Sequence, residues 1–118
     1  MPIESSYLFL ASMNVEPGHE DEFNDVYDTE HVPMLSEVPG VISIVRFQRR
    51  ELTMMLGGQL QTVAIKDEPR YTALYELESP EVLVTDAWAN AVERGRWPTQ
   101  VRPYTRDRHH QLLHRLGR

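Results

Sequence analysis

The sequence of 118 residues predicts one α+β domain in which a strand–helix–strand unit is followed by a second one. Short apolar, β-branched runs alternate with segments of helical periodicity. The turn pairs Pro17-Gly18 and Pro39-Gly40 separate the first of these segments. The length leaves room for one hydrophobic core and not for two. We therefore expect a single domain over residues 1–118.

The first strand is predicted at residues 7–13, an apolar run that ends before Pro17-Gly18. A helix should start near residue 20, where three successive acidic residues favour the positive end of the helix dipole. Val32 precedes Pro33 and is therefore biased out of helical geometry, which predicts a break or kink near His31.

The second and third strands are predicted at residues 41–47 and 70–77. The connection 48–69 between them is long, and three interpretations remain: it folds over a pocket, adds a small hairpin, or contacts a partner. A second helix should begin at Ser79-Pro80-Glu81 and end at Gly95. Its apolar stripe comprises Leu83, Val84, Ala87, Trp88 and Ala91. A last strand is expected within residues 101–109, with Pro103 at its start or at an edge.

The order strand, helix, strand, strand, helix, strand is that of ferredoxin-like α+β folds with a four-stranded antiparallel sheet. Both helices then cover one sheet face, yet the strands carry apolar residues on both faces. On the first strand, Phe9 and Ala11 point one way while Leu8 and Leu10 point the other. A face exposed to water would be polar. We therefore expect two copies to pack sheet against sheet, as a homodimer enclosing a cavity.

Charge and composition argue against several classes of partner and of cellular location. The net charge is −6 although residues 94–118 hold seven of the twelve Lys and Arg, so the body is acidic and no nucleic acid is expected to bind. This basic C-terminal segment is expected to be solvated, frayed or docked on a partner. Its His109, His110 and His114 would suit a metal only on a helix, and no metal is expected. No apolar run is long enough to span a membrane and no basic signal segment opens the chain. With zero cysteines, a cytoplasmic location is expected.

One motif carries a resemblance to a known family. Tyr27 and His31 stand four residues apart, followed by Pro33-Met34 and then by Pro39-Gly40 before the second strand. Over residues 23–47 this pattern resembles the EthD-like branch of the dimeric α+β barrel superfamily. The resemblance implies a dimeric α+β barrel, and relatives that include lactone isomerases, polyketide cyclases, small monooxygenases and decarboxylases. Most of these work without a cofactor, some use haem, and many have no assigned activity. The 48–69 connection and the basic end depart from this pattern.

His31 is the candidate catalytic residue. An imidazole titrates near neutrality and can take a proton from a carbon acid or a phenol and return it. The helix end, together with Asp28 and Glu30, is expected to favour its protonated form. Tyr27 would orient a substrate or share a proton with His31. The alternative is that His31 caps the helix carbonyls and packs on Leu35, with Tyr27 in the core.

Further residues are candidates for binding a substrate. Phe9, Phe47 and Tyr75 would line an aromatic cavity, although such residues on strands ordinarily just pack. Arg46 interrupts an apolar strand and would hold a substrate carboxylate, unless it forms a salt bridge at the sheet edge. Trp97 would lie at a pocket rim or a dimer contact.

Two functions of different classes follow. The first is a small cofactor-independent enzyme that acts by proton transfer on an aromatic, lactone or polyketide-like molecule, with His31 and Tyr27 in the site. The second is a non-catalytic dimer that binds a small hydrophobic molecule or serves a stress-related role. A haem-binding oxygenase is a third alternative. An open apolar cavity that reaches the His31 ring favours the enzyme, whereas a sealed and satisfied ring favours the binding protein.

Overall fold

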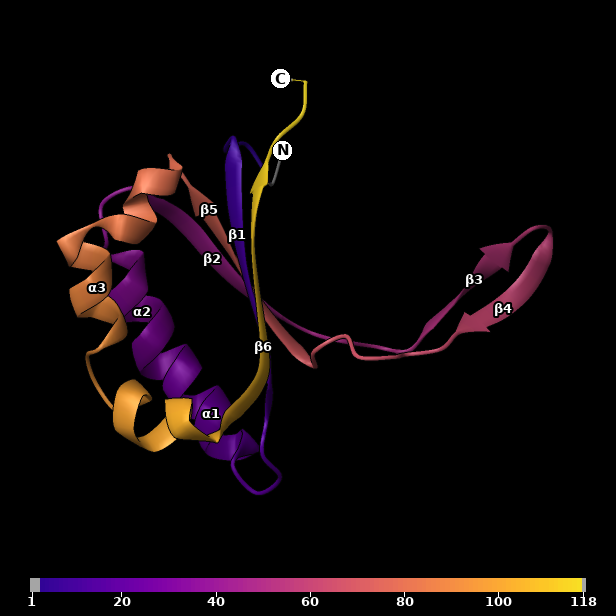
Figure 1. Ribbon diagram of the computed structural model, residues 1–118, viewed down its shortest axis with the longest axis horizontal. Coiled ribbons are helices and arrows are strands. Elements are labelled where there is room, and N and C mark those ends of the chain that lie inside the picture. Colours follow the sequence, from indigo (N-terminus) through magenta and orange to yellow (C-terminus); the bar gives the residue numbers. More distant parts are fainter. Residues whose placement is uncertain (1–2, 118) are drawn as a thin grey trace.

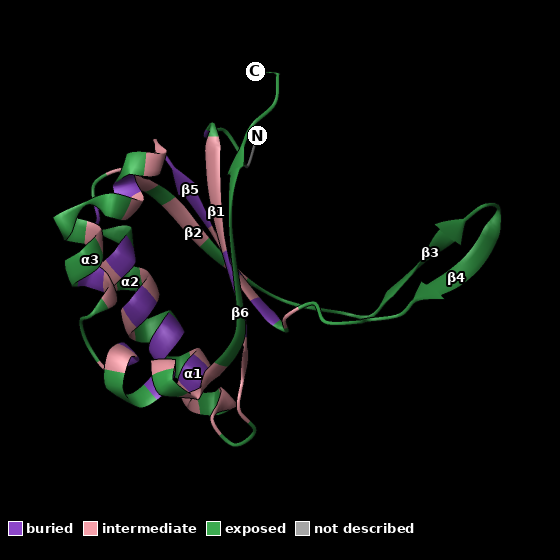
Figure 2. Cartoon of the chain, viewed as in Figure 1, coloured by how far each residue is buried: buried purple, intermediate pink, exposed green. Residues whose placement is uncertain are grey.

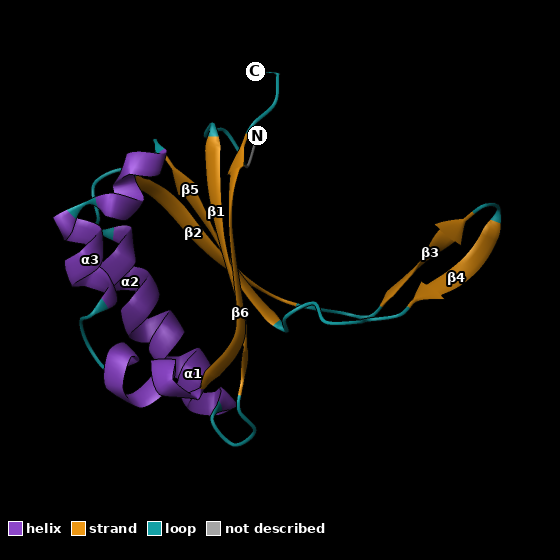
Figure 3. Cartoon of the chain, in the orientation of Figure 1, coloured by secondary structure: helices purple, strands orange, loops and turns teal. Residues whose placement is uncertain are grey.

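The structure, a computed structural model, describes residues 3–117. Six strands and three α-helices, joined in places by short π-helical and 3₁₀ turns, make up this part of the chain (Figures 1 and 3). They follow the order β1 (Tyr7–Val15), α1 (Glu20–Val26), a π-helical turn (Tyr27–His31), α2 (Val32–Ser36), β2 (Val41–Gln48), β3 (Leu52–Leu56), β4 (Gln59–Val63), β5 (Tyr71–Leu77), a 3₁₀ turn (Pro80–Val84), α3 (Asp86–Val92), a second π-helical turn (Trp97–Val101), a 3₁₀ turn (Arg102–Tyr104) and β6 (Thr105–His114).

Four strands form one antiparallel sheet in the order β2-β5-β1-β6. The three α-helices all lie on one side of it (Figure 1). This arrangement confirms the predicted ferredoxin-like α+β fold and places the N-terminal strand in the middle of the sheet.

The core lies between the helices and the sheet. Ala11 and Met13 of β1 stand opposite Ala73 and Tyr71 of β5, and all four side chains are buried on the helix side. Phe23 of α1 packs against them. Purple, buried segments accordingly occur in the helices and in β1 and β5 (Figure 2).

The opposite face of the sheet carries no helix, and we call it the bare face. Val45 and Phe47 of β2 lie on it and are 47% and 54% exposed. Leu8 and Leu10 of β1 are only partly buried there. The predicted apolar character of both faces is therefore confirmed, whereas a second copy covering the bare face stays a prediction.

Of the break or kink expected near His31, the break is wrong, but the helix does become irregular there. Val32 keeps helical backbone angles, and its N–H bonds to the Tyr27 carbonyl five residues earlier, so the helix continues through a widened π-helical turn into α2. Pro33 lies in the first turn of α2. The wide turn accommodates a residue that lacks the N–H of a regular helix, and such turns occur frequently at functional sites.

The expected single helix from residue 79 to Gly95 is also wrong. Residues 80–84 form a 3₁₀ turn, Thr85 is extended, and α3 starts afresh with the Thr85 hydroxyl oxygen accepting the Trp88 N–H at 3.2 Å. With this capping interaction, α3 begins as a helix separate from the 3₁₀ turn. Val84 is 82% exposed and takes no part in the predicted apolar stripe, whereas Ala91 is buried.

The part of the basic C-terminal segment that carries His109, His110 and His114 is neither frayed nor helical. Residues 105–114 form the edge strand β6, longer than predicted, which pairs with β1 from Val15↔Thr105 to Tyr7↔His114. The described residues contain no cluster of metal-ligating side chains. No helix among them has the length and apolar character needed to cross a bilayer.

Of the three interpretations of the connection 48–69, the small hairpin is confirmed. Strands β3 and β4 pair around Gly57-Gly58, whose positive φ angles of 59° and 81° fit a tight hairpin turn. We call residues 50–69 the arm. It extends away from the sheet on the side opposite the helices, and every residue of its two strands is exposed (Figures 1 and 2).

Candidate functional site

A cavity of about 440 Å³ lies between the helix layer and the sheet of a single chain. Seven ring side chains from both layers line it: Phe9, Tyr27, His31, Tyr75, Trp88, Trp97 and His110. We expected the cavity between two facing sheets, and for the pocket beside His31 this is wrong. A larger hollow, of about 650 Å³, lies at the base of the arm and is lined mostly by charged residues of the arm and of β6, Arg108 among them.

The His31 ring is held between two aromatic side chains. Trp97 stacks on it, with centroids 4.1 Å apart and planes within 13°. The Tyr27 ring meets it edge to face at 5.0 Å. The imidazole is only 5% exposed, and its Nδ1 atom is buried without a hydrogen-bond partner among the described residues. The alternative that His31 caps helix carbonyls is therefore not observed.

Burial, together with the nearby guanidinium groups of Arg102, Arg108 and Arg46, lowers the pKa of His31 to about 4. The imidazole is therefore neutral at pH 7 and can accept a proton. The expectation that Asp28 and Glu30 favour the protonated form is wrong. Arg46 pairs with Asp28 at 2.7 Å, and Arg96 pairs with Glu30 at 2.5 Å, so both carboxylates are neutralised by other cations.

The hydroxyls of Tyr27 and Tyr75 meet at 3.1 Å across the cavity wall. Burial raises the pKa of both phenols, so both stay protonated at neutral pH. Each hydroxyl carries one hydrogen, and the bond between them uses only one. The second hydrogen is available to a ligand oxygen.

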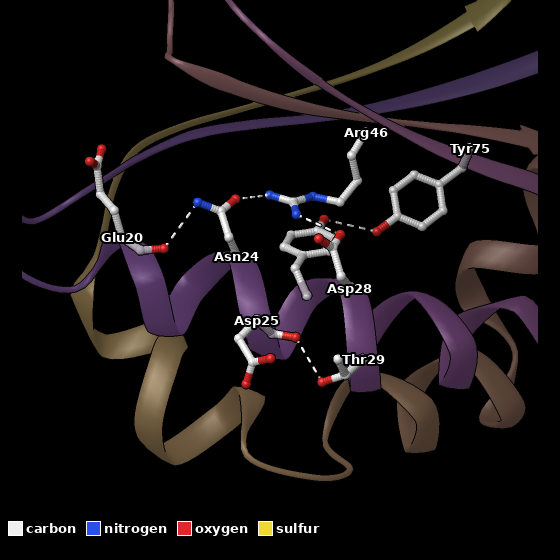
Figure 4. A network of polar contacts seen from close by, with 8 residues as sticks. Glu20, Asn24, Asp25, Asp28, Thr29, Arg46 and Tyr75 are labelled. Atoms are coloured by element: carbon white, nitrogen blue, oxygen red, sulfur yellow. Dashed lines mark hydrogen bonds and ion pairs between the residues drawn. The ribbon is translucent and has the colours of Figure 1, made fainter.

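Arg46 and Phe47 lie outside this cavity. The Arg46 guanidinium bonds to Asn24 and Asp28 of the helix layer, and it stacks over the Tyr27 ring at 4.4 Å (Figure 4). It thereby packs on Tyr27 without lining the cavity. Phe47 points to the bare face. The structure thus brings together five of the seven predicted site residues: Phe9, Tyr27, His31, Tyr75 and Trp97.

Sequence reasoning missed three polar residues of the cavity: Arg102, Arg108 and His110. All three come from the C-terminal segment, which was expected to be solvated or docked elsewhere. Trp88, expected to pack under its helix, also lines the cavity and contacts Phe9 edge to face at 5.9 Å. Strand alternation would have placed Arg108 and His110 on one face, had the strand been predicted that far.

The low pKa of His31 predicts a loss of stability in acid. As pH falls, the unfolded chain takes up this proton near pH 6.5, whereas the folded chain takes it up only near pH 4. The unfolded state binds more protons between these values, so the free energy of unfolding falls by about 3 kcal/mol over this window. Urea unfolding at a series of pH values measures it.

The matched control for this prediction is His31→Gln. The carboxylates of Glu30 and Glu93, whose pKa values are lowered by Arg96 and Arg102, lose their own contributions in acid in both proteins. Only the wild type should show the additional loss between pH 6.5 and 4. Parallel curves for the two proteins would contradict a buried neutral His31.

No protein-family model matches the chain, and no curated protein matches it. Solved structures do share its fold. A "Putative antibiotic biosynthesis monooxygenase" from Bordetella bronchiseptica aligns over 97% of this chain and 100% of its own, with a TM-score of 0.65 and 16% identity.

Two further solved structures are similar. The heme-degrader MhuD from Mycobacterium tuberculosis, with two hemes bound in its active site, covers 95% of this chain and 97% of its own, with a TM-score of 0.56 and 15% identity. An ethyl tert-butyl ether d (EthD) family protein from Bacillus halodurans covers 93% and 99%, with a TM-score of 0.57 and 10% identity. At these identities the likeness shows the shared ferredoxin-like α+β fold.

Proposed function

We propose that this chain is a small cofactor-independent enzyme that transfers a proton within an enolisable aromatic, lactone or polyketide-like substrate. One observation carries the proposal: a neutral imidazole, buried yet part of the wall of an aromatic cavity, whose Nδ1 atom has no hydrogen-bond partner among the described residues. A polar group left without a partner inside a protein costs stability, and such groups occur where a ligand or a reaction uses them.

The residues suggest the following reaction. His31 takes a proton from a carbon next to a carbonyl group; the electrons of the broken C–H bond move to the carbonyl oxygen and form an enolate. The free hydrogen of the Tyr27–Tyr75 pair donates to that oxygen. The imidazolium then returns its proton to the same or to a conjugated carbon. Nothing is oxidised or reduced, and His31 ends neutral as it began.

The rings around His31 would hold the body of the substrate. Trp97 and Tyr75 present flat apolar surfaces to the cavity, and Phe9 closes it from β1. Aromatic faces of this kind favour a planar, unsaturated molecule. Arg46, paired with Asp28 and Asn24, would act through the Tyr27 ring and not by touching the substrate.

A second candidate is a protein that binds such a molecule without turning it over. The observation that favours it is the pKa of His31 of about 4, which makes the imidazole a weak base. The two candidates predict the same ligands and differ only in proton exchange.

Deuterium exchange distinguishes them. Phenylpyruvate and α-angelica lactone, one anionic and one neutral, are incubated with the protein in D₂O, and deuterium at the carbons flanking the carbonyl is followed by NMR. We expect exchange above the buffer rate for at least one of them. Binding of either probe without faster exchange would contradict the enzyme and support the binding protein.

The visible absorbance of the purified protein is recorded first, because the fold also occurs in a heme-degrader. A Soret band would contradict the cofactor-independent part of the proposal.

We also propose that the chain works as a homodimer joined through the bare face. Half-exposed Val45 and Phe47 of β2 and Leu113 of β6 give this face an apolar surface that a monomer would leave in water. A two-fold pair of such faces covers both at once.

A further inference from the structure

Arg108 is the one guanidinium at the cavity that has no ion-pair partner among the described residues. Arg102, the other arginine in the lining, is held by Glu93 at 2.6 Å and by the Val92 carbonyl at 3.1 Å. None of the residues that line the cavity is acidic. The cavity therefore combines aromatic walls with a positive charge that nothing inside it balances.

A β-bulge directs Arg108 to this cavity. Ser12 of β1 pairs with His109 and Asn14 pairs with Arg106, so the single residue Met13 between them faces two residues of β6. The extra residue is Asp107, whose φ of 53° is the one positive value among the described residues other than glycine. Its carboxylate is held by the Asn14 side chain at 2.9 Å.

The bulge changes which side chains face the helices. Beyond it, Arg108 alternates with His110 on the side of the sheet that carries Met13 and the core, whereas Arg106 stands opposite Asn14 on the other side. Bulges of this kind redirect side chains beside functional sites, and an uncommon backbone angle at a residue other than glycine costs stability. The chain thus maintains a strained position next to the cavity that places a cation there.

We propose that the ligand of this cavity is an aromatic anion whose carboxylate or phenolate is bound by Arg108 while its ring lies among Trp88, Trp97 and Tyr75. This inference names the substrate class of the proposed function and rests on it. A guanidinium binds carboxylates and phenolates through charge-assisted hydrogen bonds, and the ring faces bind the remainder of the molecule.

Binding of an anion would also raise the basicity of His31. The positive charges of Arg102, Arg108 and Arg46 all disfavour a protonated imidazole. A ligand carboxylate beside Arg108 offsets this field, so His31 becomes a stronger base once the substrate is in place. His110, the other ionisable cavity residue on β6, has its pKa lowered by burial and by Arg108 and stays neutral at pH 7.

The test compares 2-naphthoate with 2-naphthamide, which share a ring system and differ in charge. Isothermal titration at pH 7 should show the acid binding at least tenfold more tightly than the amide to the wild type. Arg108→Gln should remove this preference by weakening the acid and leave the affinity for the amide within about twofold. The matched control is Arg106→Gln, which lies on the other side of the sheet in an ion pair with Glu16 and should keep the preference.

Each of the following outcomes refutes one part of the proposal. Equal binding of acid and amide to the wild type refutes the anionic ligand and leaves the proton-transfer proposal standing for neutral substrates. A preference that survives in Arg108→Gln refutes the role of Arg108. Failure of both compounds to bind refutes an aromatic ligand altogether, and with it the aromatic part of the proposed function.

An independent observation concerns the arm. Strands β3 and β4 contact each other, every residue in them is exposed, and an isolated two-stranded hairpin is only marginally stable in water. Leu52, Met54, Leu56 and Val63 share one face of this hairpin. The radius of gyration is 16.0 Å, against about 13 Å for a compact chain of this length. Apolar residues are thus carried away from the body of the protein.

We infer that the arm packs on a second copy of this chain. It leaves the sheet between β2 and β5 and extends on the side of the bare face, opposite the helices (Figure 1). A copy seated on the bare face would therefore lie beside the arm, which carries exposed apolar residues on both of its faces, so one neighbour covers two exposed apolar surfaces.

Shortening the arm tests this inference. The Arg49 N–H bonds to the Arg70 carbonyl at 2.7 Å, so these residues are close enough for residues 50–69 to be replaced by the turn Asn-Gly. Sedimentation across a concentration series should show the dimer dissociating at concentrations at least tenfold higher than in the wild type. Circular dichroism checks that the sheet is kept. Unchanged dissociation refutes the contact, whereas a monomeric wild type refutes both the arm contact and the bare-face dimer. The control Thr53→Ser on the other face of the hairpin should leave the dimer unchanged.

Discussion

Replacement of His31 by glutamine is expected to slow proton exchange in the cavity by roughly 10²- to 10⁴-fold, the usual contribution of a positioned general base. Glutamine keeps a polar side chain of similar reach but cannot accept a proton at neutral pH. The folded state should persist, because the native imidazole is neutral and its Nδ1 makes no hydrogen bond among the described residues that the substitution would break. The exchange assay with phenylpyruvate and α-angelica lactone measures the loss.

A binding measurement distinguishes the loss of the base from a general disruption of the cavity. The stacking surface of Trp97 remains in the variant, so the affinity of a probe should change far less than its exchange rate. His109→Gln provides the matched control, because His109 is an imidazole on β6 that pairs with Ser12 and does not line the cavity. Equal exchange by His31→Gln and the wild type would remove His31 from the mechanism.

The pH profile carries further information. The base must be neutral to act, and kcat/KM reports the ionisation of the free enzyme. With the His31 pKa near 4, kcat/KM should stay level from neutral pH down to about pH 4 and decline below it. A decline centred near 6.5 would instead indicate an imidazole exposed to water.

Three strands of the central sheet could be predicted because they are short runs rich in apolar and β-branched residues. β1 and β5 contain buried residues and β2 contains partly buried ones, and their residue types are typical of strands that pack against a core. β6 is different: His109, His110 and Gln111 are polar, and the strand is held by backbone bonds to β1 at the sheet edge. Backbone pairing leaves no mark in composition, so the strand was placed too early and too short.

The electrostatics of the site could likewise be predicted only in part from the sequence. Tyr27 and His31 could be paired from their spacing, because four residues make one helical turn. The direction in which the His31 pKa shifts could not be predicted, because Asp28 and Glu30 are near in sequence but form ion pairs with Arg46 and Arg96. The cations that act on the imidazole come from the other end of the chain, and only the fold brings them there.

The largest expected effect on assembly is that of Phe47→Asp on the bare face. Half of the Phe47 side chain is exposed in the single chain, so covering it contributes about 1–2 kcal/mol for each protomer. Two-fold symmetry places the residue in the interface twice, and the loss doubles to about 2–4 kcal/mol, or a ~30- to 1000-fold weaker dimer. A carboxylate without a partner in the interface adds to this loss.

Sedimentation velocity at micromolar concentration should therefore show a dimer for the wild type and a monomer for Phe47→Asp. Val84→Asp is the matched control: Val84 is 82% exposed, lies on the 3₁₀ turn before α3, and should tolerate the same change without effect on assembly. Because His31 lies on the helix side of the sheet, a monomeric Phe47→Asp protein should keep its cavity and still bind the aromatic probes. Loss of binding together with the dimer would show that the second copy helps to form the cavity, and a wild type that sediments as a monomer would contradict the dimer itself.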